Sequence, residues 1–466
     1  MAHASTTWSL HPAQIARTIR LKADPTHAIA TPARARHSGS RRGYIDWLRG
    51  LAILIMIETH VLDAWTRPAD RGSVLFGYAK VLGGFAAPLF LFLAGVAVVF
   101  ATRARLKKTG SLALAARSVQ IRGWQIFGLA LLFRFQAWVL NPAASIVQLL
   151  KVDILNIMGP TIAFAAIMCG AARERGSRLV TFGLATALTV LATPPVRATG
   201  VLAWLPDPVE GYLRPAGAYH DFTLFPWAGF VFAGAFVGTL LDRPRSRAED
   251  LAFHGRLAGA GLALAVASDY AWYLPSIYAR TEFWTTSPTF FFMRTGILVA
   301  AVGIVFLQQS LPPVSALGRL RARSASERVK RASHASGAGS EGLREGAAWG
   351  DGGPTSDRAW RGAGVPAIQE KRERAGGAGG AKPPGSNMMQ RFGRSSLLVY
   401  WVHVEIAYGV LTKRLYHHLP LERSISGFVA LSLLMFAMVV VKDSIKERWK
   451  GRRQRQRQPA DMAVAT

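Results

Sequence analysis

Apolar residues along this chain form long blocks, and each block contains few charges. A block is about 18 to 25 residues long, which is the length that a helix needs to cross about 30 Å of hydrocarbon. The pattern therefore predicts an all-α fold, a polytopic bundle of about ten transmembrane helices. We expect these helices near residues 44–65, 74–101, 121–140, 152–172, 179–196, 222–241, 256–275, 289–310, 392–412 and 425–442.

Basic residues between the blocks predict how the bundle is oriented. Every second connection is rich in Arg and Lys, as in "RARLKK", "RERGSR" and "RPRSR", while the connections between them carry few. Loops with an excess of Arg and Lys stay in the cytoplasm. We expect a multi-pass protein of the inner (plasma) membrane with both termini in the cytoplasm.

Three segments differ in composition from the apolar blocks. Residues 1–43, 312–391 and 446–466 are rich in basic and small residues and poor in large aliphatic ones. Such segments cannot bury enough apolar surface to fold, so we expect a disordered N-terminal tail, a disordered linker and a disordered C-terminal tail. The membrane core is then residues 44–311, with helices one to eight, and residues 392–445, with helices nine and ten.

The net charge of +29 in 466 residues is compatible with nucleic-acid binding, but its distribution is not. The basic residues follow alternate loops and tails, as in a membrane protein, so we expect a lipid bilayer as partner and no nucleic acid. The single cysteine, Cys169, excludes an intrachain disulfide and a cysteine-based metal site. Because the histidines are scattered as well, we expect no metal site and no permanently bound cofactor.

Ionisable residues inside the predicted helices gather at one depth. Such residues are costly in a bilayer and usually face a cavity or a partner. Counted from the cytoplasmic end of each helix at ~1.5 Å per residue, most fall in the outer half. They predict a polar chamber open to the outer face, with a narrower route inward past Arg49. The ionisable residues on the acceptor side of this chamber are Glu58, Arg134, Asp153, His220, Asp221, Asp269, Arg294, His403 and Glu405.

Structural roles remain open for the charged members of this set. Arg294 and Asp153 lie near helix ends, from which their side chains can extend to the membrane interface. Arg134 and Asp269 have opposite charges at similar depth, so they can form a structural ion pair.

The histidines of the set also have structural alternatives. His403 can be a core histidine whose ring bonds Tyr400 or a backbone carbonyl. His220 and its neighbour Asp221 can be ordinary loop residues. A functional role is favoured most for the histidine of the first helix, because that helix carries three polar groups.

The first helix contains "DWLRGLAILIMIETH", with Arg49, Glu58 and His60. Imidazole exchanges protons near neutral pH, so His60 can act as a catalytic general base or as a nucleophile that takes an acyl group. Glu58 points about 200° away from His60 around the helix. The acidic residues that can orient the imidazole from other helices are Asp221, Asp269 and Glu405.

Arg49 lies eleven residues before His60, about three helical turns or ~16.5 Å along nearly one face. An anion held at Arg49 can extend a thin arm toward His60, and the pantetheine arm of an acyl-CoA has about that reach. Arginine suits phosphate recognition. Further basic residues that can bind the donor at the inner mouth are Arg42, Arg117 and Arg122, each of which can instead be a positive-inside anchor.

Four stretches, in chain order, carry a resemblance: "YIDWLRGLAILIMIETH", "APLFLFLAGVAVVF", "LFPWAGFVFAGAFVG" and "GRSSLLVYWVH". They resemble the heparan-alpha-glucosaminide N-acetyltransferase catalytic-domain family and its bacterial relatives, within the acyltransferase-3-like transmembrane acyltransferases. The resemblance covers about residues 41–445 without the linker. Its first block is the most specific, because it joins an Arg and a His with ten residues between them inside an apolar helix.

The resemblance implies transfer of an acyl group, usually acetyl, from cytoplasmic acyl-CoA to a sugar or similar acceptor on the far side of the membrane. The functional histidine of the family matches His60, and the basic residue of the wider superfamily matches Arg49. An aromatic-proline block of the family matches Phe225 to Trp227, which puts Trp227 on the acceptor side. The sequence departs from the family at Glu58, where an apolar or small residue is expected.

Three functions are compatible with these features. The first is an acyl-CoA-dependent transmembrane acyltransferase of the cell envelope that modifies a sugar or glycan. The second is a transporter or flippase for a sugar or lipid-linked precursor, which the missing internal repeat disfavours. The third is a membrane scaffold whose basic linker binds anionic lipid. The acyltransferase accounts for Arg49 and His60, and the sequence leaves the acceptor and a homo-oligomeric state open.

Overall fold

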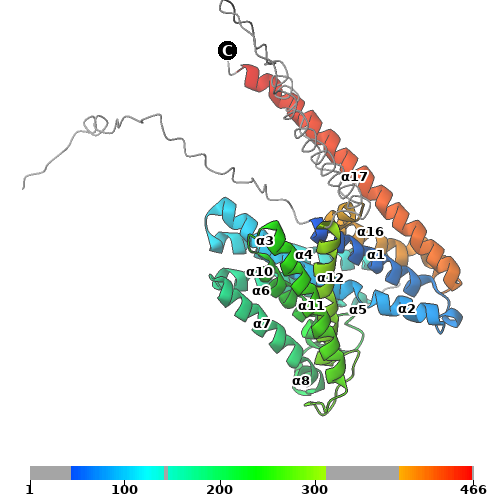
Figure 1. The fold of residues 1–466 in the computed structure, drawn as a ribbon. Helices are drawn as coiled ribbons and strands as arrows, with labels where there is room; N and C mark the ends of the chain where they lie inside the picture. Colours follow the sequence, from blue (N-terminus) through cyan, green and yellow to red (C-terminus); the bar gives the residue numbers. More distant parts are fainter. Residues whose placement is uncertain (1–42, 141–144, 311–387, 464–466) are drawn as a thin grey trace, which may run out of the picture. The chain divides into compact units, whose positions relative to one another are not determined.

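The computed structural model describes residues 43–140, 145–310 and 388–463, with side chains as far as residue 449. Within these ranges the regular secondary structure is helical, as the sequence predicts (Figure 1). The predicted N-terminal tail and linker lie outside the described residues, apart from Gly43 and the four residues from Met388 to Arg391.

The helices follow one another along the chain with short connections. The first are α1 (Gly43–Trp65), η2 (Pro68–Asp70), α2 (Val74–Gly83), α3 (Ala86–Thr109), α4 (Leu112–Val139), α5 (Ile146–Leu150), α6 (Ile154–Ala171), α7 (Arg175–Leu191) and α8 (Thr193–Ala198). The remainder are η3 (Val201–Trp204), α9 (Asp207–Leu213), α10 (Leu224–Leu241), α11 (Arg247–Trp272), α12 (Pro288–Ser310), α15 (Met388–Arg394), α16 (Ser396–Tyr408), η4 (Val410–Leu415) and α17 (Leu421–Ala463).

Several of these helices are long and apolar enough to cross a membrane. In the described part of the chain, seven segments meet this condition: Val74–Thr109, Ile154–Ala171, Arg175–Ala198, Leu224–Leu241, Arg247–Trp272, Pro288–Ser310 and Leu421–Trp449. The protein is therefore an all-α, multi-pass membrane protein. Helices α1, α4 and α16, which the sequence also predicts as spans, are not among the seven, so the count of ten and the orientation of the termini stay predictions.

The apolar block predicted as one helix at 74–101 is two helices. α2 ends at Gly83 and α3 begins at Ala86, with a turn at Gly84 and Phe85 between them. Two successive glycines form helices poorly, and the hydropathy of the block does not register this. The prediction of a single helix here is wrong.

Two further predicted helices are divided. The one expected at 179–196 ends at Leu191, and α8 starts with Pro194 at its second position, where a missing N–H costs nothing. The one expected at 392–412 is α15 followed by α16, separated at Ser395. At the C-terminal end the difference is the reverse, because α17 continues to Ala463 through the segment that the sequence predicts to be disordered.

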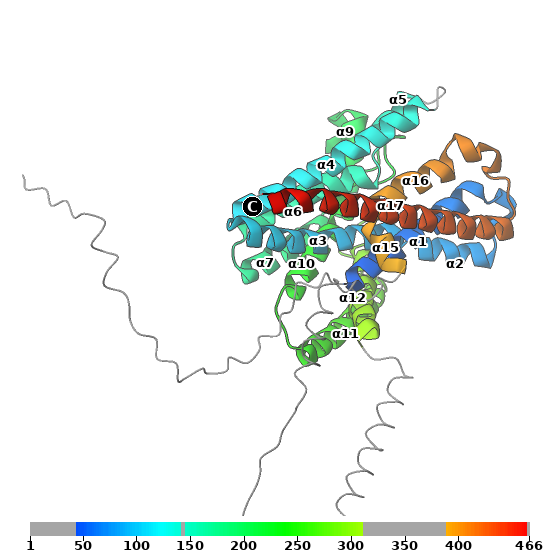
Figure 2. The same cartoon turned by 90° about the horizontal axis from the view of Figure 1, so that it is seen from above.

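Helix α10 lies among α3, α6 and α7 in both ribbon views (Figures 1 and 2). Glycines let α3 and α10 approach closely. A methyl group added at Gly234 would lie 1.9 Å from the carbonyl oxygen of Phe92, and one at Gly95 would lie 1.9 Å from that of Val231. Small residues at such crossings are the usual means of packing helices inside a membrane.

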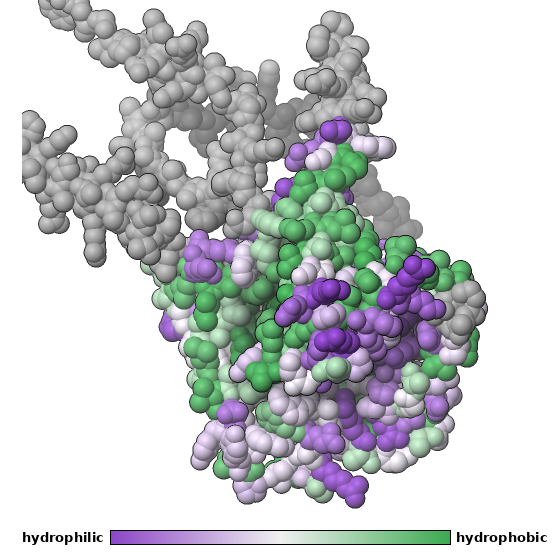
Figure 3. Space-filling view, turned by 90° about the vertical axis from the view of Figure 1, so that its right-hand side faces the viewer, coloured by the Kyte–Doolittle hydropathy of each residue, from purple (hydrophilic) through white to green (hydrophobic). Residues whose placement is uncertain are grey.

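The surface of the helices is largely apolar. Leu75, Val81, Leu188, Val266 and Leu433 are each at least half exposed. Figure 3 shows hydrophobic side chains over broad areas of one face, with hydrophilic side chains gathered in separate patches. Exposed apolar area of this extent is unfavourable in water, so it fits a surface in contact with lipid.

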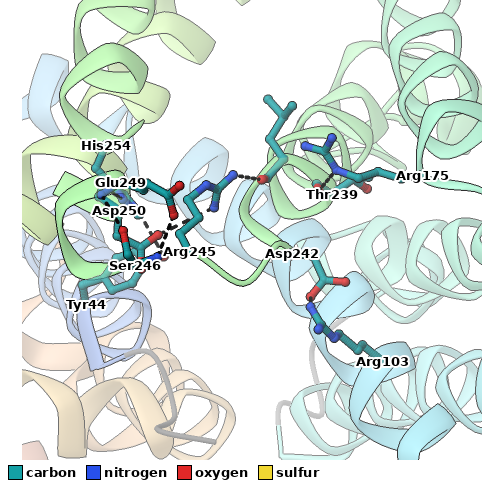
Figure 4. Close-up of polar contacts among 11 residues, drawn as sticks. Tyr44, Arg103, Arg175, Thr239, Asp242, Arg245, Ser246, Glu249, Asp250 and His254 are labelled. Carbon is teal, nitrogen blue, oxygen red and sulfur yellow. Dashed lines mark hydrogen bonds and ion pairs between the residues drawn. The ribbon is translucent and has the colours of Figure 1, made fainter. Parts of the chain in front are cut away.

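Arginine side chains close the C-terminal end of α10 (Figure 4). Arg103 forms an ion pair with Asp242, Arg175 Nε donates to the Thr239 carbonyl at 3.3 Å, and Arg245 donates to another carbonyl of the last turn at 2.8 Å. Arg175 and Arg245 thus satisfy carbonyls that a helix end leaves without partners, and all three cations lie at the negative end of the helix dipole.

The same end of the bundle gathers the connections that the sequence predicts to be cytoplasmic. The arginines come from the end of α3, the start of α7 and the segment before α11, and these are the segments with "RARLKK", "RERGSR" and "RPRSR". His254 of α11 also contacts the hydroxyl of Tyr44, at the start of α1, at 3.4 Å (Figure 4). The N-terminal end of α1 therefore lies with these basic connections.

Candidate functional site

His60 on α1 and His403 on α16 form a hydrogen-bonded pair. Nδ1 of His60 lies 3.0 Å from Nε2 of His403. The two rings are 14° from parallel and their centroids are 5.1 Å apart, so the imidazoles meet edge to edge through these nitrogens. His403 is fully buried and His60 is partly exposed. The exposed member of the pair is the one that a substrate can reach.

The contacts of His403 determine which nitrogens of the pair carry protons. Nδ1 of His403 lies 2.7 Å from the carbonyl oxygen of Val399. A carbonyl only accepts, so this nitrogen donates, and in a neutral imidazole the other nitrogen must then accept. The proton between the two rings therefore belongs to Nδ1 of His60. Nε2 of neutral His60 is left with a free lone pair.

In the described part of the chain, none of the acidic groups predicted to orient His60 forms a hydrogen bond with it. Asp221 pairs with Arg134, Asp269 is exposed on α11, and one carboxylate oxygen of Glu405 is buried without a hydrogen-bond partner among the described residues. The prediction of an acidic partner is wrong, because a neutral imidazole supplies the acceptor in its place. The structural alternative for His403, a bond to a backbone carbonyl, is confirmed.

Tyr408 packs against His60, and Glu58 lies two residues before it on α1. The ring of Tyr408 packs edge-on to the His60 ring at 5.5 Å between centroids, and its hydroxyl donates to Asp63 at 2.9 Å. Glu58 is buried and accepts from the hydroxyl of Thr59 at 3.3 Å. Among the described contacts, Glu58 thus bonds its own neighbour in the chain and not His60.

Arg49 lies at the other end of the same face of α1. Its guanidinium donates to the hydroxyl of Ser396 at 3.0 Å, which places it at the first turn of α16. Of the other predicted donor-binding residues, Arg117 and Arg122 are exposed on α4, where Arg122 bonds Gln125. Arg42 lies outside the described residues.

A cluster of charged side chains surrounds the junction of α15 and α16. Arg394 pairs with buried Asp46 of α1 at 3.1 Å. Lys442 of α17 donates to Ser395, the residue between the two helices. The start of α16 is therefore joined to both α1 and α17, next to the serine that Arg49 contacts.

Arg134 forms ion pairs with two acidic residues of the predicted chamber. Its guanidinium lies 3.3 Å from Asp153 and 3.2 Å from Asp221, and Lys151 also pairs with Asp221 at 2.5 Å. Asp153 caps α6 as well, because it accepts backbone N–H bonds at the first turn. The structural ion pair expected between Arg134 and Asp269 is wrong: Arg134 turns toward α6 and the segment before α10.

A cavity of about 330 Å³ opens beside this ion-pair network. Its walls come from α8, the segment before α10, α10, the α11–α12 connection and α12. It is lined by Arg197, Pro215, His220, Asp221, Thr223, Pro226, Trp227, Phe230, Trp284, Thr285, Ser287, Phe290, Phe291 and Arg294. Four residues predicted for the acceptor side, His220, Asp221, Trp227 and Arg294, are thus brought together.

The α2–α3 turn lies between the cavity and the helix that carries His60. At the α2–α3 turn, a methyl group on Gly83 would lie 2.2 Å from the Thr59 hydroxyl, and one on Gly84 would lie 3.0 Å from Arg294 Nη2. The turn therefore separates the neighbour of His60 from an arginine of the cavity. Separately, the indole N–H of Trp401, two residues before His403, donates to Gln136 of α4 at 3.1 Å and joins α16 to α4.

These helices and contacts define a class of protein. It is a multi-pass helical membrane protein in which His60 of α1 pairs with His403 of α16, and Arg49 lies three turns before His60 on α1. The family model for the catalytic region of heparan-alpha-glucosaminide N-acetyltransferase matches residues 41–275, and the chain belongs to this family. The family is one of membrane acetyltransferases that use acetyl-CoA. The predicted resemblance is confirmed. Comparison with curated proteins gave no significant match.

Several residues of the site were not predicted from the sequence. Arg197, Trp284 and Phe290 line the cavity, and Ser396 contacts Arg49. Arg197 has a recognisable signal, because predicted outer connections carry few basic residues. Ser396 follows Arg394 and Ser395 in "GRSS". This stretch supports the family resemblance through its position after the other three stretches, and nothing in its residue types indicates a contact with Arg49.

Proposed function

We propose that this protein is a membrane acetyltransferase that takes an acetyl group from acetyl-CoA on the cytoplasmic side and transfers it to a hydroxyl or amine of a sugar or glycan at the outer face. The observation that carries this proposal is the pair of His60 and His403. The bond of His403 to the Val399 carbonyl, at 2.7 Å, leaves Nε2 of His60 unprotonated. An unprotonated imidazole nitrogen is the group that acyl transfer requires.

The reaction can follow a covalent route. Nε2 of His60 attacks the thioester carbonyl, the C–S bond breaks, and CoA leaves as a thiolate. The Nδ1 proton moves toward Nε2 of His403, whose own Nδ1–H stays on the Val399 carbonyl. The acceptor then attacks the acetyl carbon, the bond to His60 breaks, and the proton returns from Nε2 of His403 to Nδ1 of His60. The proton that the acceptor loses balances the one that the CoA sulfur takes up.

A direct route uses the same lone pair. Nε2 of His60 then removes the proton of the acceptor as its oxygen or nitrogen attacks the thioester, and the proton passes to the sulfur of CoA. The products are the same in both routes: an acetylated acceptor and free CoA. His403 stabilises the charge that develops on His60 in either case, because it accepts from Nδ1.

The position of Arg49 supports a donor that enters from the other end of α1. Arg49 and His60 are eleven residues apart on one helix, which corresponds to ~16.5 Å. The Ser396 hydroxyl holds the guanidinium at the first turn of α16. A phosphate of CoA bound there would let the pantetheine arm carry the thioester along α1 toward the histidine pair.

A reconstituted system tests transfer across the membrane. The protein is placed in liposomes that enclose glucosamine, and acetyl-CoA with a labelled acetyl group is added outside. We expect labelled N-acetylglucosamine inside the liposomes, and free CoA outside. Label transferred only to glucosamine supplied on the donor side would contradict the proposal, as would the absence of CoA release.

Two variants control this experiment. Arg49→Met should raise the acetyl-CoA concentration needed for half-maximal CoA release. Arg280→Met removes an arginine that is exposed in the connection between α11 and α12 and does not line the cavity. We expect its rate to equal that of the unaltered protein, so a loss of CoA release in Arg49→Met alone would come from the donor site.

A further inference from the structure

The cavity beside Arg134 offers hydrogen-bond donors and little acceptor capacity. We propose that it binds the anionic group of a sugar acceptor, a phosphate, sulfate or carboxylate, between Arg197 and Arg294, with the sugar ring against its tryptophans. This inference rests on the proposed function, because it takes the cavity to be the acceptor site. It adds that the acceptor carries a negative charge, a property that the fold alone does not indicate.

The two arginines reach the cavity from different helices. Arg197 closes α8, and Arg294 lies on α12. Among the described residues, no carboxylate lies within 4 Å of either guanidinium, and Nε of each is buried without a hydrogen-bond partner. Arg197 donates from Nη2 to Thr223 and to the Phe225 carbonyl, both at 3.3 Å.

Arg294 is held by aromatic rings. Its guanidinium carbon lies 4.0 Å from the ring centroid of Phe290 and 5.8 Å from that of Phe85. These rings hold the cation in place while they supply no anion. A partly buried cation without a counter-ion is costly, and an anionic ligand removes that cost.

The other polar groups of the lining strengthen the preference for an anion. Nδ1 of His220 accepts from the Ala216 N–H at 3.3 Å, so in its neutral form the free Nε2 carries a proton and donates. The one carboxylate of the lining, Asp221, is held by Arg134 and Lys151. The charge of Glu282 acts on Arg197 through space, but its carboxylate forms no ion pair with that guanidinium and accepts from the hydroxyl of Thr285 at 2.8 Å.

Aromatic side chains supply the surface for a sugar ring. Trp227 and Trp284 both line the cavity, and Trp284 is 66% exposed. The C–H groups of a sugar pack on the flat face of an indole, and the ring's apolar area makes that contact favourable. A volume of about 330 Å³ is at the lower end for ligand pockets and fits one sugar residue with its anionic substituent.

Direct binding tests this inference without any acetyl transfer. The protein with His60→Ala, purified in detergent, is titrated with glucosamine 6-phosphate and with glucosamine, and tryptophan fluorescence is followed. We expect the phosphorylated sugar to bind at least about tenfold more tightly, since a bond to a charged group contributes that much. We also expect the difference to shrink as salt is added.

Variants of the cavity assign the preference to its arginines. Arg294→Met and Arg197→Met should each remove most of the difference between the two sugars, and Arg294→Lys should retain part of it. Arg280→Met is the matched control and should bind both sugars as the parent does. The thermal unfolding midpoint of each variant shows whether a loss of binding comes from a loss of fold.

Three results would overturn the inference. One is equal affinity for the neutral and the phosphorylated sugar. Another is inorganic phosphate that binds as tightly as glucosamine 6-phosphate, because the aromatic walls would then contribute nothing. The third is a site occupied only in nanodiscs that contain phosphatidylglycerol, which would make the ligand a lipid headgroup. A lack of acetyl transfer together with a retained preference for the phosphorylated sugar would instead count against the proposed function alone.

Discussion

Nδ1 of His60 and Nε2 of His403 lie 3.0 Å apart, although the residues are 343 positions apart in the chain. The contact joins α1 to α16, and it fixes the protonation of both rings through the Val399 carbonyl. In catalytic triads a carboxylate holds the histidine in the tautomer and orientation that acyl transfer needs. In this protein the orienting group is a neutral imidazole, where other sites use a carboxylate.

His403 should therefore affect the rate of acetyl transfer through His60, without contacting the substrate itself. In His403→Leu the hydrogen of Nδ1 on His60 loses its acceptor, and the imidazole can turn or change tautomer. We expect acetyl transfer to fall by about 10²- to 10⁴-fold, the range that general acid–base catalysis supplies. His403→Gln should keep part of the rate, because an amide oxygen can accept the same hydrogen. Initial rates and the unfolding midpoint of both variants check this, and equal rates in Leu and Gln variants would contradict it.

Arg49 should determine the affinity for the donor. Its guanidinium sits on Ser396 at the first turn of α16, and a phosphate of CoA placed there would gain a charge-assisted bond. Arg49→Met should raise the KM for acetyl-CoA by roughly tenfold or more, with a smaller effect on kcat. Arg49→Lys should lie between, because lysine keeps the charge and loses the planar guanidinium. Arg105→Met, an exposed arginine of α3, is the control, and an unchanged KM in Arg49→Met would refute the assignment.

The crossing of α3 and α10 should tolerate no side chain. A methyl group at Gly234 would lie 1.9 Å from the Phe92 carbonyl oxygen, so Gly234→Ala must separate the helices or deform them. We expect a loss of about 1–3 kcal/mol in stability, as for overpacked cores, seen as a lower unfolding midpoint in detergent. Gly128→Ala on α4 is the matched control, because no described atom lies within 4 Å of the added carbon. It should be neutral or more stable by about 0.5–1 kcal/mol, and the same loss in both variants would contradict the account.

Asp70 should make the stability of the protein depend on pH. Its carboxylate accepts the backbone N–H of Leu421 at 2.9 Å and pairs with Arg67. The Leu421 N–H, followed by Arg67, holds the pKa of Asp70 below its usual range. Because this pKa is lowered in the folded state, the ionised carboxylate stabilises the protein at pH values above its ordinary pKa of ~3.9. This stabilisation is lost as the pH falls through the folded-state pKa.

The matching experiment compares the protein with Asp70→Asn. The variant should unfold at a lower temperature at pH 6, where the carboxylate is charged, and the gap between the two midpoints should close toward pH 3. Thermal unfolding at a series of pH values measures this gap. A gap that stays constant with pH would show that the charge of Asp70 contributes nothing to the link between η2 and α17.

The sequence predicts those elements of this fold that depend only on residue type and spacing along the chain. Blocks of apolar residues give the helices, and the positions of Arg49 and His60 on one helix give their common face. Depth in the membrane follows from counting residues, and it places Arg134 with Asp153 and Asp221 as well as with Asp269. Depth gives no direction around the helix axis, however, so it could not tell which of these acids Arg134 reaches.

Contacts between distant helices were not predictable from composition. The expected partners of His60 were acids, because of their charge, while the neutral ring of His403 is the group that the packing of α1 on α16 supplies. The break between α2 and α3 was missed for a related reason. Hydropathy averages over Gly83 and Gly84, whereas the backbone turns there to fit against Thr59.

The central claim is that the lone pair of His60 Nε2 carries out acyl transfer. Its most direct test is the initial rate of CoA release and acetyl transfer to glucosamine for the protein and for His60→Ala, with the mass of the peptide that contains residue 60 followed after rapid quenching. We expect His60→Ala to lose transfer by at least about 10²-fold while it still binds acetyl-CoA. An acetyl group found on that peptide in the unaltered protein alone would identify the covalent route. Transfer by His60→Ala at the rate of the unaltered protein would contradict the account.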